Sequence, residues 1–471
     1  MHFRAVLRRM DRAAGWCRRA GARVGATIVI AWFTVSATMA QEWWTTTRNG
    51  IPDVSIATSL PNTGDPGGVR KWLSERGIVY GLEYTNDVLS NMRGGQRTGT
   101  IDQGKVHGIL TVDFGKLAGW QGLSLFANMF QIHNTGRIRR DYVGGVNTIA
   151  AIEAVPATRL SELWLEQKFA NDKVSIRAGQ LAADSEFFYS DLSTMFLQSD
   201  WPTIGALNLP SGGAAYPLST PGARLKVEPI RDVSLLLAVL NGDPAGPPGP
   251  GLSPDEQIRN RHGLNFRVND PPFVIGEAQF RRNTGNQDTG LATTLKLGGW
   301  QHFAQFDNRR FANLGILIGS SFGYDAVHQG NFGVYAIIDQ QLYRPPGGDQ
   351  QSGISVYSRA SLSPSDRNLI SAYIDGGIVF ANLVPGRPND RFGAGVIHAR
   401  FSKSVNSIDP DTLAFTGTPV RDHETNLELS YQAQIVPGWI VQPNLQFIWH
   451  PSGDPSIRTA TVVGVRSQWR Y

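Results

Sequence analysis

From about residue 78 onward, apolar and polar residues alternate in short runs, and a period of two predicts β-strands. The segment 160–169 shows this pattern clearly. Its apolar face carries Leu163, Leu165 and Phe169, and its polar face carries Glu162, Trp164, Glu166 and Lys168. A turn at Asn171–Asp172 separates it from a second alternating run over 174–179. Two such runs joined by a short turn predict an antiparallel hairpin.

Further alternating runs predict more strands, and the connections between them differ in length. The runs cover 224–228, 233–239, 264–268, 274–281 and 291–297. Besides the turn above, short turns are predicted at Pro229–Asp232 and Asn269–Pro272, and long loops rich in Gly and Pro at 182–222, 241–262 and 344–352. Short turns at one end and long loops at the other are typical of outer-membrane β-barrels.

Charged side chains stand in the middle of several predicted strands. A cation that faces lipid near the bilayer midplane costs about 2–4 kcal/mol, so we expect these faces to line the interior of a barrel. An interior this polar is expected to hold water, which predicts a pore. After residue 40, no apolar run approaches the ~20 residues that a membrane-spanning helix needs. A membrane-spanning fold would therefore use strands.

The N-terminus has the pattern of a cleaved signal peptide. An arginine-rich stretch over 1–23 precedes the apolar run Val24–Val35, and small residues follow up to Ala40. The run is about a dozen residues long, short of the ~20 of a spanning helix, although an uncleaved anchor is the alternative. We expect residues 1–40 to be removed.

Charge and cysteine content exclude several classes of protein. The formal charge of +5 is concentrated in the first 23 residues, so the rest of the chain gives no support for nucleic-acid binding. The single cysteine, Cys17, lies in the predicted signal peptide. The mature chain would therefore hold no disulfide, zinc–thiolate site or cysteine nucleophile. We expect no cofactor and no metal.

The two ends of the mature chain have separate features. Residues 41–77 are expected to be an N-terminal periplasmic segment with a short helix, in which Val69, Trp72 and Leu73 share a face, and residues 78–471 the barrel. The last residues alternate up to the terminal Tyr471. This tail resembles the closing-strand signal that the barrel-assembly machinery recognises, although Tyr replaces the usual Phe.

Several blocks of sequence, in this order, resemble the OprB-type carbohydrate-selective porins along nearly the whole mature chain. The family usually has Trp at the position of Pro66. The blocks are Thr63–Gly77, Gly94–Gly95, Val112–Trp120, Leu163–Phe169, Arg177–Gln180, Glu186–Phe187, Tyr216–Pro217, Pro221–Val227, Glu428–Tyr431, Pro443–Ile448, Pro451 and Gly464–Arg466. The resemblance implies an all-β, antiparallel transmembrane barrel of about 16 strands in the bacterial outer membrane, and passive uptake of sugars.

A sugar-selective pore needs aromatic surfaces for the CH faces of the sugar and polar groups for its hydroxyls. The long segment 184–221 contains several aromatic residues, and we expect it to fold into the lumen and narrow the pore; a surface loop is the alternative. From the alternation along the neighbouring strands, we expect their charged residues to face the lumen beside this segment. The predicted constriction residues are Glu162, Trp164, Glu166, Arg177, Arg224, Lys226, Glu277, Arg281, Trp201 and Tyr216. The alternative is that most of these charges form ordinary lumen ion pairs.

Other aromatic residues are assigned to the interfacial girdles: Trp120, Trp300, Phe303, Trp439 and Trp449.

The expected partners are carbohydrates, outer-membrane lipid and lipopolysaccharide, and the assembly machinery; a homo-oligomer is left open. Three alternatives remain: a general or polyol-permeable porin, an outer-membrane enzyme, and a secreted sugar-binding β-protein. The pair His423–Glu424 lacks the second His of the zinc-protease helix, so it supports no enzyme.

Overall fold

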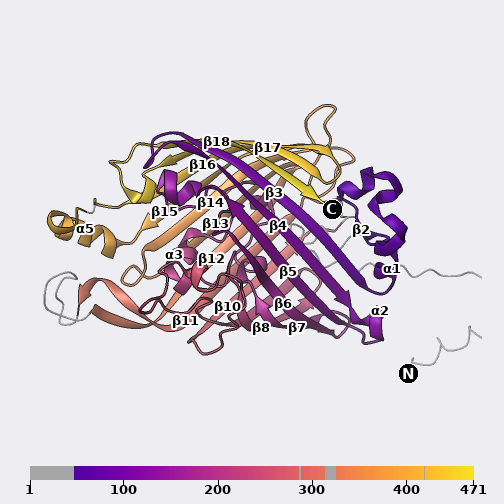
Figure 1. Cartoon of the computed structure of the whole chain (residues 1–471), viewed down its shortest axis with the longest axis horizontal. Coiled ribbons are helices and arrows are strands. Elements are labelled where there is room, and N and C mark those ends of the chain that lie inside the picture. Colours follow the sequence, from indigo (N-terminus) through magenta and orange to yellow (C-terminus); the bar gives the residue numbers. More distant parts are fainter. Residues whose placement is uncertain (1–46, 286–287, 313–324, 418) are drawn as a thin grey trace, which may run out of the picture. The chain divides into compact units, whose positions relative to one another are not determined.

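The computed structural model describes residues 47–471 except 286–287, 313–324 and 418. Sixteen strands of these residues, β3 to β18, pair with their neighbours in the chain and close into an antiparallel barrel (Figure 1). This confirms the predicted fold class. No helix among the described residues has both the length and the apolar character to cross a bilayer.

The strands run up and down in chain order, and short helical turns interrupt the connections. The barrel strands are β3 Ile78–Arg93, β4 Gly99–Asp113, β5 Leu123–Asn134, β6 Ala157–Phe169, β7 Val174–Leu181, β8 Thr220–Ile230, β9 Val233–Asn241, β10 Pro272–Arg282, β11 Thr293–Ala312, β12 Asp325–Tyr343, β13 Gly353–Leu362, β14 Ile370–Ala381, β15 Arg391–Phe401, β16 His423–Val436, β17 Trp439–Trp449 and β18 Ala460–Arg470. The helices outside the strands are α1 Val69–Glu75, α2 Phe114–Ala118, α3 Thr203–Asn208, α4 Glu256–Arg259 and α5 Lys403–Thr416, with 3-10 turns such as η9 Pro451–Gly453 and the π-helical turn η4 Ile138–Val143.

The barrel closes where β18 pairs with β3, and the N-terminal segment packs beside this seam. The backbone of Leu82 exchanges two hydrogen bonds with that of Tyr471, at 2.9 and 2.7 Å. The Tyr471 hydroxyl donates to the carbonyl of Gly64 at 2.7 Å, and the Arg70 guanidinium lies 4.6 Å from the centre of its ring. The predicted helix is α1, but it buries Arg70 and leaves Val69 and Trp72 about half exposed. The segment is therefore held by a cation rather than by the apolar face.

The two ends of the barrel differ in their connections. At one end, which we call the turn end, lie the C-terminus, α1 and α2 (Figure 1). The other end, which we call the loop end, carries α5 and the longer loops (Figure 1). The described connections at the loop end are 94–98, 135–156, 182–219, 242–271, 363–369, 402–422 and 450–459. The predicted asymmetry is thus present.

Three predictions about the connections are wrong. Residues 264–268 are not a strand but part of the loop 242–271, and Phe266 and Val268 are exposed there. Asn269–Pro272 is therefore not a short turn between strands: residues 269–271 end the same long loop, and Pro272 begins β10. Three alternating residues in an irregular loop can imitate a strand. The segment 344–352 joins β12 to β13 at the turn end, whereas the prediction placed it with the long loops at the other end. Its Gly and Pro content reflects the turn itself, not the side of the barrel.

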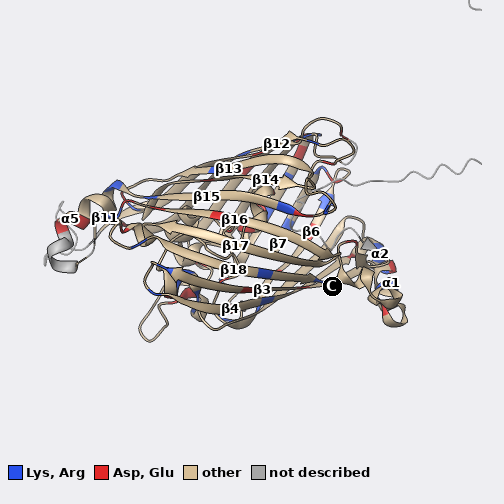
Figure 2. Ribbon diagram, turned by 90° about the horizontal axis from the view of Figure 1, so that it is seen from above, with Lys and Arg blue, Asp and Glu red and all other residues tan. Residues whose placement is uncertain are grey.

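Side-chain parity separates the outside from the lumen as predicted. Leu165, Leu237 and Val239 are exposed, whereas Glu166 and Arg224 point inward and are buried. In Figure 2 most of each strand is tan, with separated blue and red positions. An apolar band with charges turned inward is the pattern that a lipid-facing barrel requires.

The girdle prediction holds for some aromatic residues and fails for one. Trp439 and Trp469 stack at the turn end with 6.2 Å between ring centres, and Tyr84 stacks on Trp469 at 5.6 Å. Trp120 and Phe303 are exposed. Trp300, in contrast, points into the barrel and is only 5% exposed. It pairs with Ile275 on β10 and belongs to the lumen packing described below, so its assignment to the girdle is wrong.

Candidate functional site: the constriction of the lumen

The connection between β7 and β8, residues 182–219, folds into the barrel as predicted; we call it the inserted segment. Its Phe188, Trp201 and Ile204 are buried against inward-facing residues of the strands. Phe188 stacks on Tyr335 with 4.2 Å between ring centres. The strands contribute Leu236, Leu240, Phe273, Ile275, Trp300, Tyr335, Ile337, Ile370, Tyr373 and Ile397 to this cluster. One side of the lumen is therefore a packed, dry interface, whereas the sequence predicted only a polar, water-filled interior that this segment narrows.

Carboxylates of the barrel wall fix the backbone of the inserted segment. Glu277 accepts a hydrogen bond from the N–H of Phe188 at 3.0 Å. Asp339 accepts from the N–H of Asp191 at 3.0 Å. Glu428 accepts from the N–H groups of Leu197 and Gln198, both at 2.8 Å. Each carboxyl oxygen satisfies a backbone N–H of the inserted segment that would otherwise be buried without a partner, so these contacts help to determine where the segment lies.

An arginine of the wall completes the attachment. Arg359 on β13 forms a buried ion pair with Asp375 on β14. Its Nη1 also donates to the carbonyls of Phe188 and Asp200, both at 3.2 Å. The guanidinium fork can serve both partners because its donors are fixed in one plane.

A second loop, 135–156, also reaches inward, and the sequence analysis did not identify it. Glu424 on β16 accepts hydrogen bonds from the N–H groups of Val146 and Asn147 at 2.8 and 2.7 Å. The hydroxyl of Tyr216 donates to the carbonyl of Ile152 at 3.0 Å, which ties the loop to the inserted segment. The two loops together narrow the lumen.

Between these loops and the opposite wall lies a cavity of about 230 Å³. Strands β3, β4, β13 and β18 form the wall, and both inward loops contribute the rest. The lining combines cations, carboxylates, hydroxyls and aromatic rings: Glu83, Thr85, Lys105, Ala151, Ile152, Asp184, Phe188, Tyr189, Thr194, Phe196, Ser199, Asp200, Trp201, Arg359, Arg466 and Gln468.

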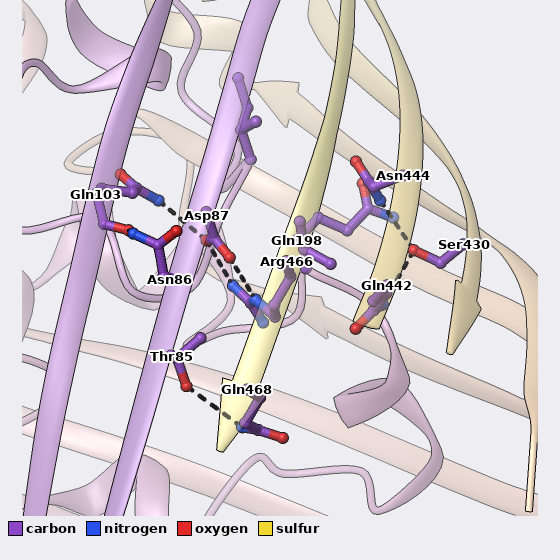
Figure 3. A network of polar contacts seen from close by, with 12 residues as sticks. Thr85, Asn86, Asp87, Gln103, Gln198, Ser430, Gln442, Asn444, Arg466 and Gln468 are labelled. Atoms are coloured by element: carbon purple, nitrogen blue, oxygen red, sulfur yellow. Dashed lines mark hydrogen bonds and ion pairs between the residues drawn. The ribbon is translucent and has the colours of Figure 1, made fainter. Parts of the chain in front are cut away.

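A polar network fixes the wall side of the cavity (Figure 3). Arg466 on β18 binds Asp87 on β3 through two hydrogen bonds of 2.7 and 2.9 Å, across the seam of the barrel. Gln103 donates to the same carboxylate at 3.2 Å, and Gln468 donates to Thr85 at 3.3 Å. Side chains held in this way present preorganised donors and acceptors to a solute.

The charges around the cavity have mixed signs. The Lys105 ammonium lies 5.0 Å and 4.9 Å from the ring centres of Phe130 and Tyr216. On the inserted segment, burial and, to a smaller extent, nearby Asp184 raise the pKa of Asp200 to about 7. Burial likewise raises the pKa of Asp184 to about 6. Near neutral pH the net charge of the cavity therefore depends on these two carboxyls.

Comparison with known proteins decides the family. The family model described as carbohydrate-selective porin, OprB family, matches residues 100–471 of this chain. The chain belongs to this OprB family. This OprB-family chain is similar to Porin B of Pseudomonas aeruginosa, with 24% identity over 431 residues, 86% of this chain and 90% of the relative. It is also similar to the putative porin QuiX of Acinetobacter baylyi, with 20% identity over 461 residues, 92% of this chain and 96% of that relative.

The solved high-pH structure of Pseudomonas putida OprB has the same fold. Its TM-score with this chain is 0.76 at 19% sequence identity, and the match covers 87% of this chain and 98% of that structure. Together with the closed barrel, family membership makes this protein an outer-membrane porin for carbohydrates. Membership of this porin family indicates a channel.

In this OprB-family porin, several residues predicted from sequence meet in one ion cluster beside the cavity. Glu166 lies 2.9 Å from Arg224 and 3.4 Å from Arg177. Both arginines also pair with Glu186 of the inserted segment, at 2.8 and 3.4 Å. Glu162, Arg177, Glu186 and Arg224 line a space of only about 10 Å³, room for about one water molecule. The cluster attaches the inserted segment to β6–β8 and leaves no room for a sugar.

The other predicted residues occupy different places. Trp201 lines the cavity, and Tyr216 supports Lys105 from behind. Glu277 holds the backbone of the inserted segment, as described above. Trp164 lies under the guanidinium of Arg177, Lys226 pairs with Glu228 at 2.6 Å, and Arg281 lies near the end of β10, close to the turn end. Trp164, Lys226 and Arg281 do not line the cavity.

The cavity residues of β3, β4, β13 and β18 were missed. Lys105, Arg359 and Arg466 stand on strands far apart in sequence, and the barrel closure and the position of the inserted segment bring them together. The sequence offered one signal for these residues, which was a charge at an inward position of an alternating run. Many other lumen residues have the same feature, so it could not single out the cavity.

Proposed function

We propose that the cavity is the eyelet of the pore and that single sugar rings pass through it one at a time. The observation that supports this most strongly is its lining, in which Trp201 and Phe196 face the same space as Lys105 and Asp200. Aromatic faces suit the CH surface of a sugar, and charged groups suit its hydroxyls. Mixed signs suit a neutral solute, whereas a ring of one sign suits an ion.

The size of the cavity supports monosaccharides over longer chains. Its volume of about 230 Å³ lies below the roughly 300–1,000 Å³ of pockets that bury drug-sized ligands. A single ring fits this scale better than a disaccharide. We propose that the ion cluster of Glu166, Arg177 and Arg224 sets the width of the eyelet by holding the inserted segment, and that Trp201 contacts the sugar.

Single-channel recording with a panel of sugars and polyols tests the proposal. Sugar binding in the eyelet interrupts the ionic current, so the half-blocking concentration measures affinity. We expect Trp201→Ala to raise it by up to about tenfold, because an aromatic contact is worth ~0.5–1.5 kcal/mol. Trp120→Ala, an exposed ring at the turn end, is the matched control. Equal effects of the two variants would contradict the proposal, and equal block by polyols would favour the polyol-permeable alternative.

We further propose the processing and orientation of the chain. Residues 1–40 are removed on export, residues 41–77 form the periplasmic segment, and the turn end faces the periplasm, which leaves the long loops outside. The short turns and the position of the C-terminus support this orientation. We also propose that the terminal strand, ending at Tyr471, is recognised by the assembly machinery and that lipopolysaccharide surrounds the loop end. A homo-oligomer stays a prediction.

A further inference from the structure

A group of histidines lies on the rim of the loop end, away from the cavity. His423 begins β16, His450 follows β17, and His398 stands near the end of β15. The ring centres of His423 and His450 are 4.6 Å apart, and those of His398 and His423 are 5.0 Å apart. The carboxylate of Asp422 lies between His423 and His450. Their side chains remain partly accessible, at 33%, 30% and 42% for His423, His450 and Asp422.

The distances within this group fit a bound ion. The Nδ1 of His450 lies 3.1 Å from Oδ1 of Asp422, and the Nδ1 of His423 lies 3.2 Å from Oδ2. One ligand atom from each of the three residues lies within 4.8 Å of the other two. A tetrahedral ion with bonds of 2.0–2.1 Å holds its ligand atoms about 3.3–3.4 Å apart. Small side-chain movements would therefore place the three ligands around one centre.

The backbone positions these side chains firmly. His450 adopts a left-handed conformation with φ of 50°, which a residue with a side chain rarely adopts. Such a conformation persists where the surroundings impose it. Asp422 is fixed from both sides: its carbonyl accepts from the N–H of Phe401 at 2.9 Å, and its N–H donates to the carbonyl of Gly453 at 3.0 Å. A preformed carboxylate and two imidazoles reduce the cost of binding an ion.

We propose that Asp422, His423 and His450 bind a divalent transition-metal ion of the zinc type. Imidazole nitrogens favour Zn²⁺, Cu²⁺ and Ni²⁺, whereas Mg²⁺ and Ca²⁺ prefer sites made of oxygen ligands. Three protein ligands leave a fourth position for water, as in open zinc sites. His398 lies next to the group, but its Nδ1 is 2.8 Å from the hydroxyl of Thr425, so we assign it a supporting role.

The bound ion would connect two loops that also contact the lumen. Asp422 ends the loop that carries α5, and His450 starts the loop that carries η9. In the second of these loops, the Ser452 N–H donates to Glu424 at 2.7 Å, and the Ser452 hydroxyl bonds the carbonyl of Gly144 in the inward loop 135–156. Glu424 also holds that inward loop. Metal binding at the rim therefore stabilises one wall of the constriction from outside.

Titration of the metal-free, detergent-solubilised mature porin with Zn²⁺, Ni²⁺, Mg²⁺ and Ca²⁺ in a calorimeter tests the proposal. We expect one Zn²⁺ per chain and much weaker binding of Mg²⁺ and Ca²⁺. His423→Ala and His450→Ala should each weaken Zn²⁺ binding at least about tenfold, as loss of even a supporting residue around a metal does. Zn²⁺ should also raise the unfolding temperature of the parent protein, but not that of these variants.

The control is His328→Ala, which removes the single imidazole that faces Asp366 at 3.6 Å near the same end of the barrel. It should leave Zn²⁺ binding unchanged. The heat-dependent gel mobility of each variant shows whether it has folded, and Asp422→Asn serves as a second variant if a histidine variant does not fold. No Zn²⁺ binding by the folded parent, or binding that the histidine variants retain, would overturn the proposal. Equal binding of Ca²⁺ would contradict the assignment to imidazole ligands.

Discussion

The inner wall of this porin has two unlike sides. Strands β9–β12, β14 and β15 present apolar residues such as Ile275 and Ile337, and the inserted segment covers them completely. Strands β16–β18 and β3–β4 present amides, carboxylates and cations, among them Asp87 and Arg466 (Figure 3). The first side holds the largely irregular inserted segment in place by burying its apolar side chains, a strong and non-directional interaction. The second side stays polar and forms the path for the solute.

The largest effect is expected at Arg359, a cavity residue on β13 whose charge is buried in an ion pair with Asp375. Arg359→Met leaves the carboxylate of Asp375 buried without its partner, which costs about 3–5 kcal/mol of unfolding free energy. It also removes the two hydrogen bonds from Nη1 to the inserted segment. Urea unfolding of the refolded porin in lipid vesicles measures the loss. The double variant Arg359→Met, Asp375→Leu is the control, since it removes both charges, and it should recover most of the stability.

A smaller effect is expected where the inserted segment meets the polar side. Glu428→Ala removes the acceptor for the N–H groups of Leu197 and Gln198. A typical hydrogen bond contributes about 0.5–1.5 kcal/mol net, so this part of the segment should detach and single-channel conductance should rise. Glu428→Gln keeps an acceptor and should change conductance less. An unchanged conductance in Glu428→Ala would show that apolar packing alone holds the segment.

The smallest effect is expected on charge selectivity, with the fold intact. The pKa of Asp184 is raised to about 6 and that of Asp200 to about 7, so raising the pH from 5 to 9 ionises both carboxyls of the cavity. Cation permeability relative to anions should therefore increase between about pH 6 and 7. Asp200→Asn should remove the part of the increase near pH 7 and keep the part near pH 6, whereas Asp454→Asn on an outer loop should change neither. The same ionisation lowers the stability of the fold. Because the pKa of Asp200 is higher in the folded than in the unfolded state, its contribution to stability is present at acid pH and is lost as the pH rises from about 4 to 7.

The outer surface was predictable because lipid imposes one rule on every strand. Leu163, Leu165 and Leu237 could be assigned to the outside from their alternation alone. The inserted segment could also be predicted, because a long segment rich in aromatic residues has few other places to bury them. The lumen follows no such rule. Ile275 and Glu277 both point inward on β10, one into the dry packing and the other to a backbone N–H.

The residues of the constriction were harder to predict for a geometrical reason. Glu166 and Arg224 were selected because they lie next to the inserted segment in sequence, and they are indeed close to it, but in an ion cluster without space. Lys105 and Arg466 become neighbours of the cavity only through closure between β18 and β3. Strand parity predicts direction, whereas height along the barrel depends on the register of all sixteen strands.

The contact between Tyr471 and the N-terminal segment has a consequence for biogenesis. In the finished barrel, Gly64 and Arg70 engage the terminal ring. These contacts can form only once the last strand is in place, because Tyr471 directly follows β18. We therefore expect a peptide tag fused after Tyr471 to weaken the packing of the N-terminal segment, whereas a tag in an external loop should leave this packing unchanged.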